Sequence, residues 1–200
     1  MTDAVTYDAH DAHATHDATA RIARRVAALR QQRALSLEAL AQRCGVSRSM
    51  ISLIERGEAS PTAVVLERLA AGLGVALASL FDDDAAPPSP LARRDAQLQW
   101  RDPASGYVRR NLSPPNHPSP LQLVAVELPP GAAVMYDSAS RSSEIHQQVV
   151  VLDGVIEATS GHEHYRLEAG DCLAMRLDRN NGYRNPGRKP ARYIVAIASR

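Results

Sequence analysis

The sequence predicts an α + β chain of two domains, a helical bundle followed by an all-β domain. From residue 19 to residue 81, apolar residues recur every three or four positions, which is helical spacing. From Leu98 onward, short runs in which apolar and polar residues alternate are interrupted by Gly and Pro turns, as in strands. The segment DDDAAPPSP at residues 82–90 lies between the two patterns and is typical of a linker.

These patterns divide the chain into four parts. They are residues 1–18 (tail), 19–81 (helical domain), 82–97 (linker) and 98–200 (β-domain). The tail carries few residues that could pack, so we expect it to be disordered. Three of its histidines recur at every third position, which is compatible with a metal site or with a solvated tail; they are His10, His13 and His16.

Composition excludes several classes of protein. The two cysteines, Cys44 and Cys172, are far apart and form no CxxC pair, so a disulfide framework or a zinc ribbon is not expected. No stretch is long and apolar enough to cross a membrane, and the N-terminus lacks the apolar core of a signal peptide. We therefore expect a cytoplasmic protein with no membrane partner and with reduced thiols.

Charge is distributed unevenly along the chain. The formal net charge is +1, but residues 21–68 contain nine arginines and four glutamates. Aspartates flank this block on both sides. A local basic region of this kind is the expected footprint of nucleic-acid binding, even when the whole chain is near neutral.

The stretch from Ser36 to Thr62 predicts a helix-turn-helix. Ser36 is a suitable N-cap for its first helix, and Gly45 can take the positive φ needed just past the end of that helix. Ser47 caps the second helix. The apolar stripe of the second helix consists of Met50, Ile51 and Ile54.

Three more helices complete the predicted bundle. A first helix at residues 19–33 places Ile22, Val26 and Leu29 on one face. Thr62 caps a fourth helix that runs to about residue 71. Residues 76–81 form a short fifth helix that closes the bundle.

The second helix of the motif has a polar face suited to reading DNA. Arginine can donate two hydrogen bonds to a guanine edge, and the N-terminal residues of a recognition helix meet the bases. We expect Arg48, Ser49 and Ser52 to contact bases, and Ser47 and Arg56 to contact phosphates. From geometry alone, a small bundle with a polar outer face that touches no DNA is the alternative.

The sequence GVSRSMISLIERGEASPTAVVLERLAAGLGV resembles the Xre (lambda-repressor-like) helix-turn-helix family, and the match runs from about Arg21 to Phe81. The resemblance implies a five-helix lambda-repressor-like bundle that binds double-stranded operator DNA. Because one such motif contacts few bases, we expect a homodimer that reads two half-sites.

Seven strands are predicted in the second half. They are Tyr107–Leu112, Leu121–Leu128, Gln147–Leu152, Val155–Thr159, Tyr165–Leu167, Cys172–Arg176 and Arg192–Ala198. Asp153-Gly154 between two apolar runs predicts a hairpin. Short strands without helices indicate a sandwich or a small barrel.

The segments VVVLDGVIEATSG, LEAGDCLAM and NNGYRNPG resemble a cupin, over about residues 105–198. The resemblance implies a cupin β-barrel (jelly-roll). A helix-turn-helix followed by a cupin also resembles a class of bacterial regulators in which the cupin binds a small effector.

Cupins commonly hold a metal with histidines and a glutamate, and the resemblance places these ligands at residues 140–143, Gln147 and Asn181. This chain has Ser, Arg, Gln and Asn there, which are poor ligands for such ions. We therefore expect no metal, no cofactor and no enzymatic activity.

The same alternation of strand residues predicts an effector pocket without metal. Its predicted lining is Tyr136, Gln147, Val149, Met175, Asn181 and Tyr183. An apolar cavity with a few convergent polar groups is typical of a small-molecule site. The alternative is that these residues form the ordinary core of a barrel that serves only for dimerisation.

We therefore predict a sequence-specific transcriptional regulator whose cupin domain binds an effector and dimerises. An antitoxin-like or autoregulatory DNA-binding protein with a purely structural cupin is one alternative. A metal-dependent cupin enzyme fused to a DNA-binding domain is the other.

Overall fold

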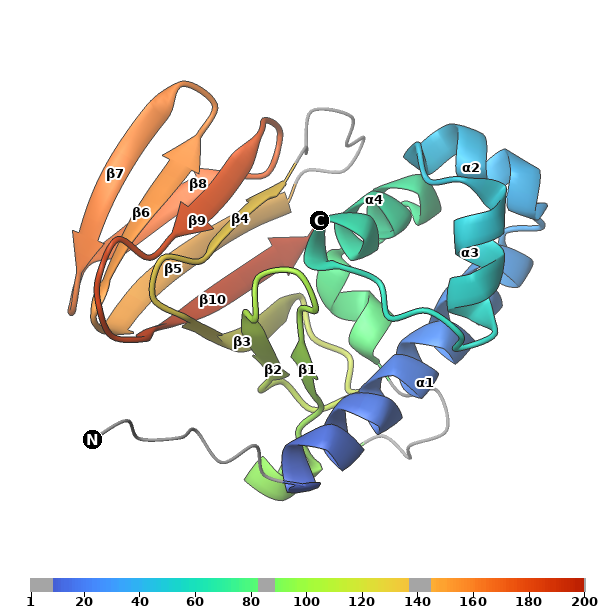
Figure 1. Ribbon diagram of the computed structural model, residues 1–200, viewed down its shortest axis with the longest axis horizontal. Coiled ribbons are helices and arrows are strands. Elements are labelled where there is room, and N and C mark those ends of the chain that lie inside the picture. The colour runs from blue at the N-terminus through green and yellow to red at the C-terminus, as the bar shows by residue number, and fades with distance from the viewer. Residues whose placement is uncertain (1–8, 83–88, 137–144, 200) are drawn as a thin grey trace.

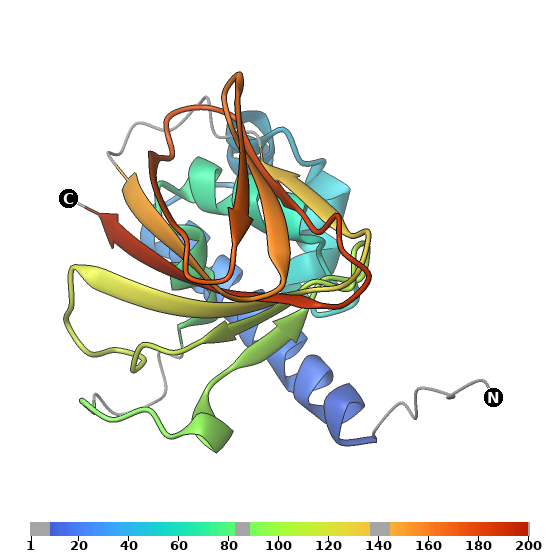
Figure 2. The ribbon, with the colours of Figure 1, turned by 90° about the vertical axis from the view of Figure 1, so that its left-hand side faces the viewer.

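The computed structural model describes residues 9–82, 89–136 and 145–199, with side chains described from Ala18 to Ala198 within these ranges. The helical part and the β-domain lie side by side, and helix α4 lies between the β-strands and the helix-turn-helix (Figure 1). Figure 2 shows the β-domain toward the viewer, with the helices behind it.

The described helical part contains four α-helices and a 3-10 helix, not five α-helices. The α-helices are α1 (Ala9–Gln32), α2 (Leu37–Cys44), α3 (Arg48–Glu55) and α4 (Ala63–Leu73). The predicted fifth helix is the 3-10 helix η1 (Leu77–Phe81), whose short run buries Leu80 and Phe81. Such tight turns are common as short connecting pieces. Helix α1 begins at Ala9, inside the segment expected to be a disordered tail.

The capping residues fix the ends of the helix-turn-helix. The hydroxyl of Ser36 accepts a hydrogen bond from the backbone N–H of Ala39 at 3.0 Å, and Ser47 accepts one from Met50 at 3.2 Å. Gly45 has φ of 65°, which a glycine adopts without steric cost. The caps predicted from the sequence are therefore confirmed.

Two antiparallel sheets form the β-domain. The six-stranded sheet has the order β1 (Gln99–Arg101), β2 (Val108–Asn111), β3 (Leu121–Leu128), β10 (Ala191–Ser199), β5 (Ile145–Asp153) and β8 (Cys172–Arg176). The four-stranded sheet has the order β4 (Ala133–Tyr136), β9 (Asn181–Arg184), β6 (Val155–Ser160) and β7 (Glu163–Glu168). This double-sheet arrangement is that of a jelly-roll, the architecture of cupins.

The expected closed barrel is not formed by the described strands. Strands β1 and β8 are the edges of one sheet, and β4 and β7 are the edges of the other. The two sheets face each other as a sandwich instead. In a jelly-roll, two sheets bury their inner apolar faces against each other, whereas in a barrel one sheet closes on itself.

The predicted hairpin at Asp153-Gly154 is wrong. Strand β5, before it, pairs with β8 and β10, whereas β6, after it, pairs with β7 and β9. The chain therefore changes sheets at Gly154. Gly154 has φ of 80°, and a Cβ added there would lie 3.0 Å from the Cα of Ala191, so both the turn and the close packing favour glycine.

Three strands, β1, β4 and β9, were not among the seven predicted from the sequence, although the alternation of Asn181 and Tyr183 on β9 was used to predict the pocket. Each contains only three or four residues, too few for alternation to stand out. Yet β1 and β4 contact the helical part, at α1 and α4 respectively. The short strands thus form part of the junction between the domains.

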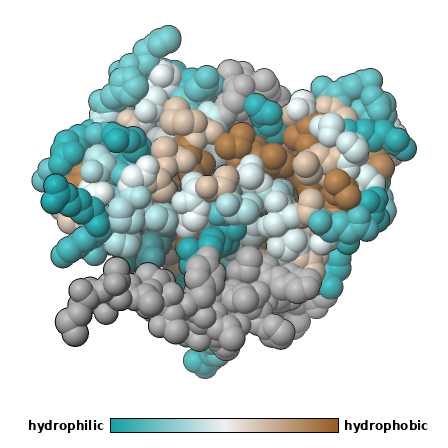
Figure 3. All heavy atoms as spheres, viewed as in Figure 1, coloured by the Kyte–Doolittle hydropathy of each residue, from teal (hydrophilic) through white to brown (hydrophobic). Residues whose placement is uncertain are grey.

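The two domains share one continuous core. Trp100 on β1 is fully buried, and its ring lies 5.9 Å from that of Phe81 and 6.2 Å from that of Tyr107, measured between centroids. Figure 3 shows hydrophobic side chains gathered across the middle of this face and hydrophilic ones toward both ends. The predicted linker therefore joins two domains that pack together. Among the described helices, none is both long and apolar enough for a membrane span.

Candidate functional site

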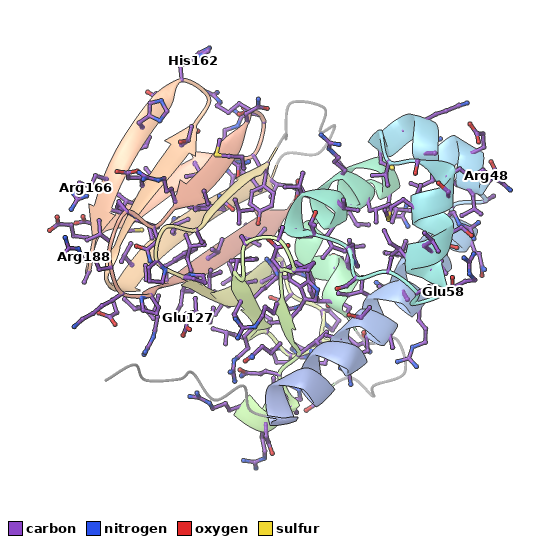
Figure 4. The ribbon with its side chains drawn as sticks, in the orientation of Figure 1. Arg48, Glu58, Glu127, His162, Arg166 and Arg188 are labelled. Carbon is purple, nitrogen blue, oxygen red and sulfur yellow. The ribbon has the colours of Figure 1, made fainter. Side chains whose placement is uncertain are left out.

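Helix α3 presents its N-terminal residues to solvent. Arg48 is exposed and lies on the outer side of α3, away from the β-domain (Figure 4). Ser47 and Ser49 are also exposed, and their hydroxyl oxygens lie 3.1 Å apart. An arginine flanked by two hydroxyls at a helix N-terminus is a suitable set of donors and acceptors for base edges and phosphates.

Two residues of α3 differ from the sequence prediction. Met50 was placed on the apolar stripe, but it is 39% exposed, while Ile51 and Ile54 are buried. Ser52 was placed on the polar face and is half-buried. The buried face of this helix is therefore shifted from the predicted one, toward Ser52 and away from Met50.

Arg56 is held by a neighbouring acid that the sequence prediction did not include. Its Nε and Nη2 donate to the two carboxylate oxygens of Glu58, each at 2.8 Å, and its Nη1 donates to Ser52 Oγ at 2.5 Å. The ion pair raises the pKa of Arg56 and lowers that of Glu58, mainly through these hydrogen bonds. A phosphate contact at Arg56 must compete with Glu58.

The orientation of α3 is fixed from α1. Arg30 donates to both carboxylate oxygens of Glu55, at 2.6 and 2.8 Å, and also to the carbonyl of Leu35 at 2.8 Å. The hydrogen bonds to Glu55 raise the pKa of Arg30. Because both side chains are largely buried, this pair is a firmer link than an exposed one.

A pocket lies where the β-domain meets the helical domain. Its cavity volume is about 50 Å³, and the total rises to about 540 Å³ when all space between the lining atoms, open solvent included, is counted. Tyrosine and aliphatic side chains of the β-domain form most of the lining, and the helical domain contributes Glu67, Ala76 and Leu77. A ligand in this pocket would therefore contact both domains.

Polar groups in the pocket are buried. Gln147 Nε2 donates to the hydroxyl of Tyr183 at 2.5 Å, and that hydroxyl lies 3.9 Å from the sulfur of Met175. Burial raises the pKa values of Tyr136, Tyr183 and Tyr193 above the ordinary tyrosine value, so these phenols remain hydrogen-bond donors even in alkaline solution.

Comparison with known proteins agrees with the helical half of this description. The HTH_3 helix-turn-helix family model matches residues 26–80. The HTH-type transcriptional regulator SutR of Escherichia coli (strain K12) is 30% identical over 170 residues, which are 84% of this chain and 89% of SutR. The chain belongs to the HTH-type transcriptional regulators. DNA binding and transcription regulation are therefore the functions of its family.

Two further matches extend over most of the regulator. The HTH-type transcriptional regulator PuuR of Escherichia coli (strain K12) is 25% identical over 175 residues, covering 86% of this chain and 92% of PuuR. The crystal structure of an HTH_3 family transcriptional regulator from Vibrio cholerae has a TM-score of 0.73 at 24% identity, covering 92% of this chain and 98% of that chain. The match to the Vibrio cholerae structure shows that this chain shares its fold.

The structure brings together four of the six residues predicted to line the pocket of the regulator: Tyr136, Gln147, Asn181 and Tyr183. Val149 and Met175 are buried but do not line this pocket. Sequence reasoning missed Glu67, Tyr107, Arg109 and Tyr193, which do line it.

The pocket does not fit the metal centre that the cupin resemblance implies. Gln147 and Asn181 offer neutral amide oxygens in place of a carboxylate and an imidazole. Across the described part of the chain, no three His, Cys, Asp or Glu side chains are grouped so that they could hold an ion. Residues 140–143, the other expected ligand positions, lie outside the described residues.

The histidines of the β-domain lie elsewhere. His146 is exposed, as its position next to the buried Gln147 on a strand requires. His162 is at the tip of the β6–β7 hairpin (Figure 4), and His164 Nδ1 lies 3.2 Å from Thr159 Oγ1 on the same hairpin.

Proposed function

We propose that this regulator binds operator DNA as a homodimer in the cytoplasm and that its β-domain binds a small effector that alters DNA binding. It acts in this proposal by binding alone, without metal, cofactor or enzymatic step. The observation that carries the proposal is the exposed N-terminus of α3, with Arg48 between two serines, in a chain of this family.

The proposed DNA contacts follow from exposure and helix position. Arg48, Ser49 and Ser52 read bases, and Ser47 and Arg56 bind phosphates. Arg48 and Ser49 are in the first turn of α3, where a recognition helix meets base edges. Arg56 contributes to DNA binding only after a phosphate replaces the Glu58 carboxylate as its hydrogen-bond acceptor. These assignments make Arg48 the residue with the largest effect on specificity.

Homodimerisation follows from the small footprint of one helix. A single recognition helix reads few base pairs, and a two-fold dimer doubles the contacts on a palindromic operator. Sedimentation of the full chain with and without its operator gives the oligomeric state. A monomer bound to a single half-site would overturn this part of the proposal.

The pocket between the domains supports effector binding. Its walls are mostly apolar and aromatic, and Gln147, Asn181 and the tyrosine hydroxyls offer polar contacts inside it. This combination is typical of small-molecule sites. Because α4 and η1 contribute to the wall, an effector would act directly on the DNA-binding domain. A purely structural β-domain would not need this pocket.

The DNA-binding part is tested with operators selected from a pool of random duplexes by the full-length protein. Arg48→Ala should weaken binding by about 1–3 kcal/mol and relax the preference at one base pair per half-site. Arg166→Ala is the matched control, because Arg166 is an exposed arginine on β7, at the opposite end of the molecule (Figure 4). Unchanged binding by Arg48→Ala would overturn the assignment of base reading.

The effector part is tested by a thermal-shift screen of small metabolites on the full chain, because the two domains share one core. Compounds that raise the melting temperature are then added to operator-binding measurements. At least one should change operator affinity. Stabilisers that leave operator affinity unchanged would count against regulation by an effector.

A further inference from the structure

Arg109 on β2 is a buried cation that lines the pocket between the domains. Only 4% of the residue is exposed. Its Nε donates to Asn111 Oδ1 at 3.3 Å, while its Nη2 has no hydrogen-bond partner among the described residues. No described carboxylate lies within 4.0 Å of its guanidinium in an ion pair. The Nη2 edge of the Arg109 guanidinium is therefore left without a polar partner.

Burying a charged donor in this way costs free energy unless an anion or an acceptor satisfies it. The guanidinium carbon lies 4.9 Å from the ring centroid of Phe81, and this cation–π contact offsets part of the cost. The ring cannot accept the hydrogen bonds that Nη2 directs along the guanidinium plane. A partner in the pocket could accept them.

We propose that the pocket takes a small organic acid with a single carboxylate and an apolar or aromatic body, bound through that carboxylate to Arg109. This inference rests on the proposed effector function and names the chemical class of the effector. A guanidinium presents parallel N–H groups that match the two oxygens of a carboxylate. The surrounding tyrosine and aliphatic side chains suit an apolar body.

Glu67 limits the charge that the ligand can carry. This buried acid of α4 lies in the wall of the same pocket. A second carboxylate on the ligand would add like charge to a site where electrostatic interactions are strengthened by burial. The pocket therefore favours monocarboxylates over dicarboxylates of similar size.

Arg109 also connects the pocket to the DNA-binding domain. Its guanidinium lies over Phe81 of η1, and its partner Asn111 donates through Nδ2 to the carbonyl of Ala78, also in η1, at 3.5 Å. An anion bound in the plane of the Arg109 guanidinium neutralises part of its charge and so weakens the cation–π contact with Phe81. The carboxylate is thus expected to change how η1 packs and, through α4, how the helix-turn-helix is held.

Titration calorimetry of the full-length protein tests the class of ligand. The probes are benzoate, 3-phenylpropionate and hexanoate, each with its amide of the same shape, and succinate as a dicarboxylate. At least one monocarboxylate should bind, with its amide and succinate weaker by about tenfold or more. Arg109→Gln should reduce the affinity for that carboxylate to the level of its amide.

Arg110→Gln is the matched control. Arg110 is the next residue on β2 and lies on the other face of the strand, where it donates to Gln99 Oε1. The Arg110→Gln variant should bind the carboxylate with the same affinity as the wild type. If Arg109→Gln does not fold, Arg109→Lys keeps the charge but loses the planar pair of donors and should still bind several-fold more weakly.

Two results would overturn the inference. Amides that bind as tightly as carboxylates, in the wild type and in Arg109→Gln, would leave an effector pocket with a different ligand class. No binding by any probe would exclude the monocarboxylate class. In both cases the proposed function would stand if the metabolite screen finds another compound that changes operator affinity. The proposed effector function itself would fail if no compound changes operator affinity.

Discussion

Asp102 of the β-domain caps the helix that follows the helix-turn-helix. Its Oδ1 accepts a hydrogen bond from the backbone N–H of Ala63, the first residue of α4, at 3.1 Å. The carboxylate is buried and also accepts from the backbone N–H groups of Ala104 and Ser105. A negative charge at a helix N-terminus is favourable because the helix dipole is positive there. The β-domain thus holds one end of α4 directly.

Asp102→Ala should lower the free energy of unfolding by about 1–3 kcal/mol, because it removes this cap and leaves the buried N–H of Ala63 without an acceptor. Urea unfolding of the full chain measures the change. Asp95→Ala is the control, since Asp95 is exposed in the 3-10 helix η2 (Arg94–Ala96) before β1. Equal stability of the two variants would show that the contact with α4 contributes nothing.

The pair between Arg30 and Glu55 should matter for stability and for DNA binding. Glu55→Ala leaves the donors of the largely buried Arg30 without their carboxylate acceptor, at a cost of about 1–3 kcal/mol. It also releases α3 from α1, so operator affinity should fall at temperatures where the protein is folded. Urea unfolding and operator titration measure the two effects.

Glu127→Ala is the control for this pair. Glu127 forms an exposed ion pair with Arg192, at 3.6 Å, on the β-domain. Exposed pairs contribute little to stability, so this variant should unfold and bind DNA nearly as the wild type does. If Glu55→Ala behaves in the same way, the link between α1 and α3 does not orient the recognition helix.

The helical half was predictable because its signals are local. Ser36, Gly45, Ser47 and Thr62 each act on the backbone within a few residues, and the structure places each one as a cap. The predicted fifth helix differs only in being a 3-10 turn. Met50 was misplaced because helical spacing does not reveal how wide a face the neighbouring helices cover.

The junction between the domains could not be predicted from the sequence. Arg109 and Glu67 are charged residues, which sequence patterns assign to the surface, yet both are buried where they line the pocket with residues of the two domains. The hairpin at Asp153-Gly154 failed for a related reason. A glycine turn shows that the chain reverses, but pairing within one sheet or passage to another is decided by distant strands.

Cys44 should react slowly with thiol reagents, whereas Cys172 should react quickly. Burial raises the pKa of the Cys44 thiol, so at a given pH a smaller fraction is the reactive thiolate. Cys172 is exposed. With iodoacetamide at neutral pH, we expect Cys172 to react at least about tenfold faster than Cys44 in the folded protein, and both to react at similar rates in urea.

Cys172→Ser should remove the fast reaction and leave only the slow one. Because the Cys44 pKa is raised, the slow reaction should accelerate as pH rises above the ordinary range of thiols. A fast reaction that persists in Cys172→Ser would mean that Cys44 is accessible and that the contact between α2 and α4 is looser than described.

Glu58 should lower the affinity of the protein for operator DNA. It occupies two donors of Arg56 at the end of the recognition helix, and its own charge faces the solvent beside that arginine. A phosphate must displace it before Arg56 can bind the backbone of the operator. Glu58→Gln keeps the size of the side chain and removes the charge. Arg56 is then available, and the local repulsion of phosphate is gone.

Operator affinity of Glu58→Gln should therefore rise several-fold at moderate salt, and the slope of log affinity against log salt should steepen by about one unit. Fluorescence anisotropy over a range of salt concentrations measures both. Glu127→Gln changes the net charge equally on a distant face (Figure 4) and should leave the slope unchanged. An equal gain in both variants would mean that overall charge is responsible, and no gain in Glu58→Gln would place Arg56 outside the phosphate contacts.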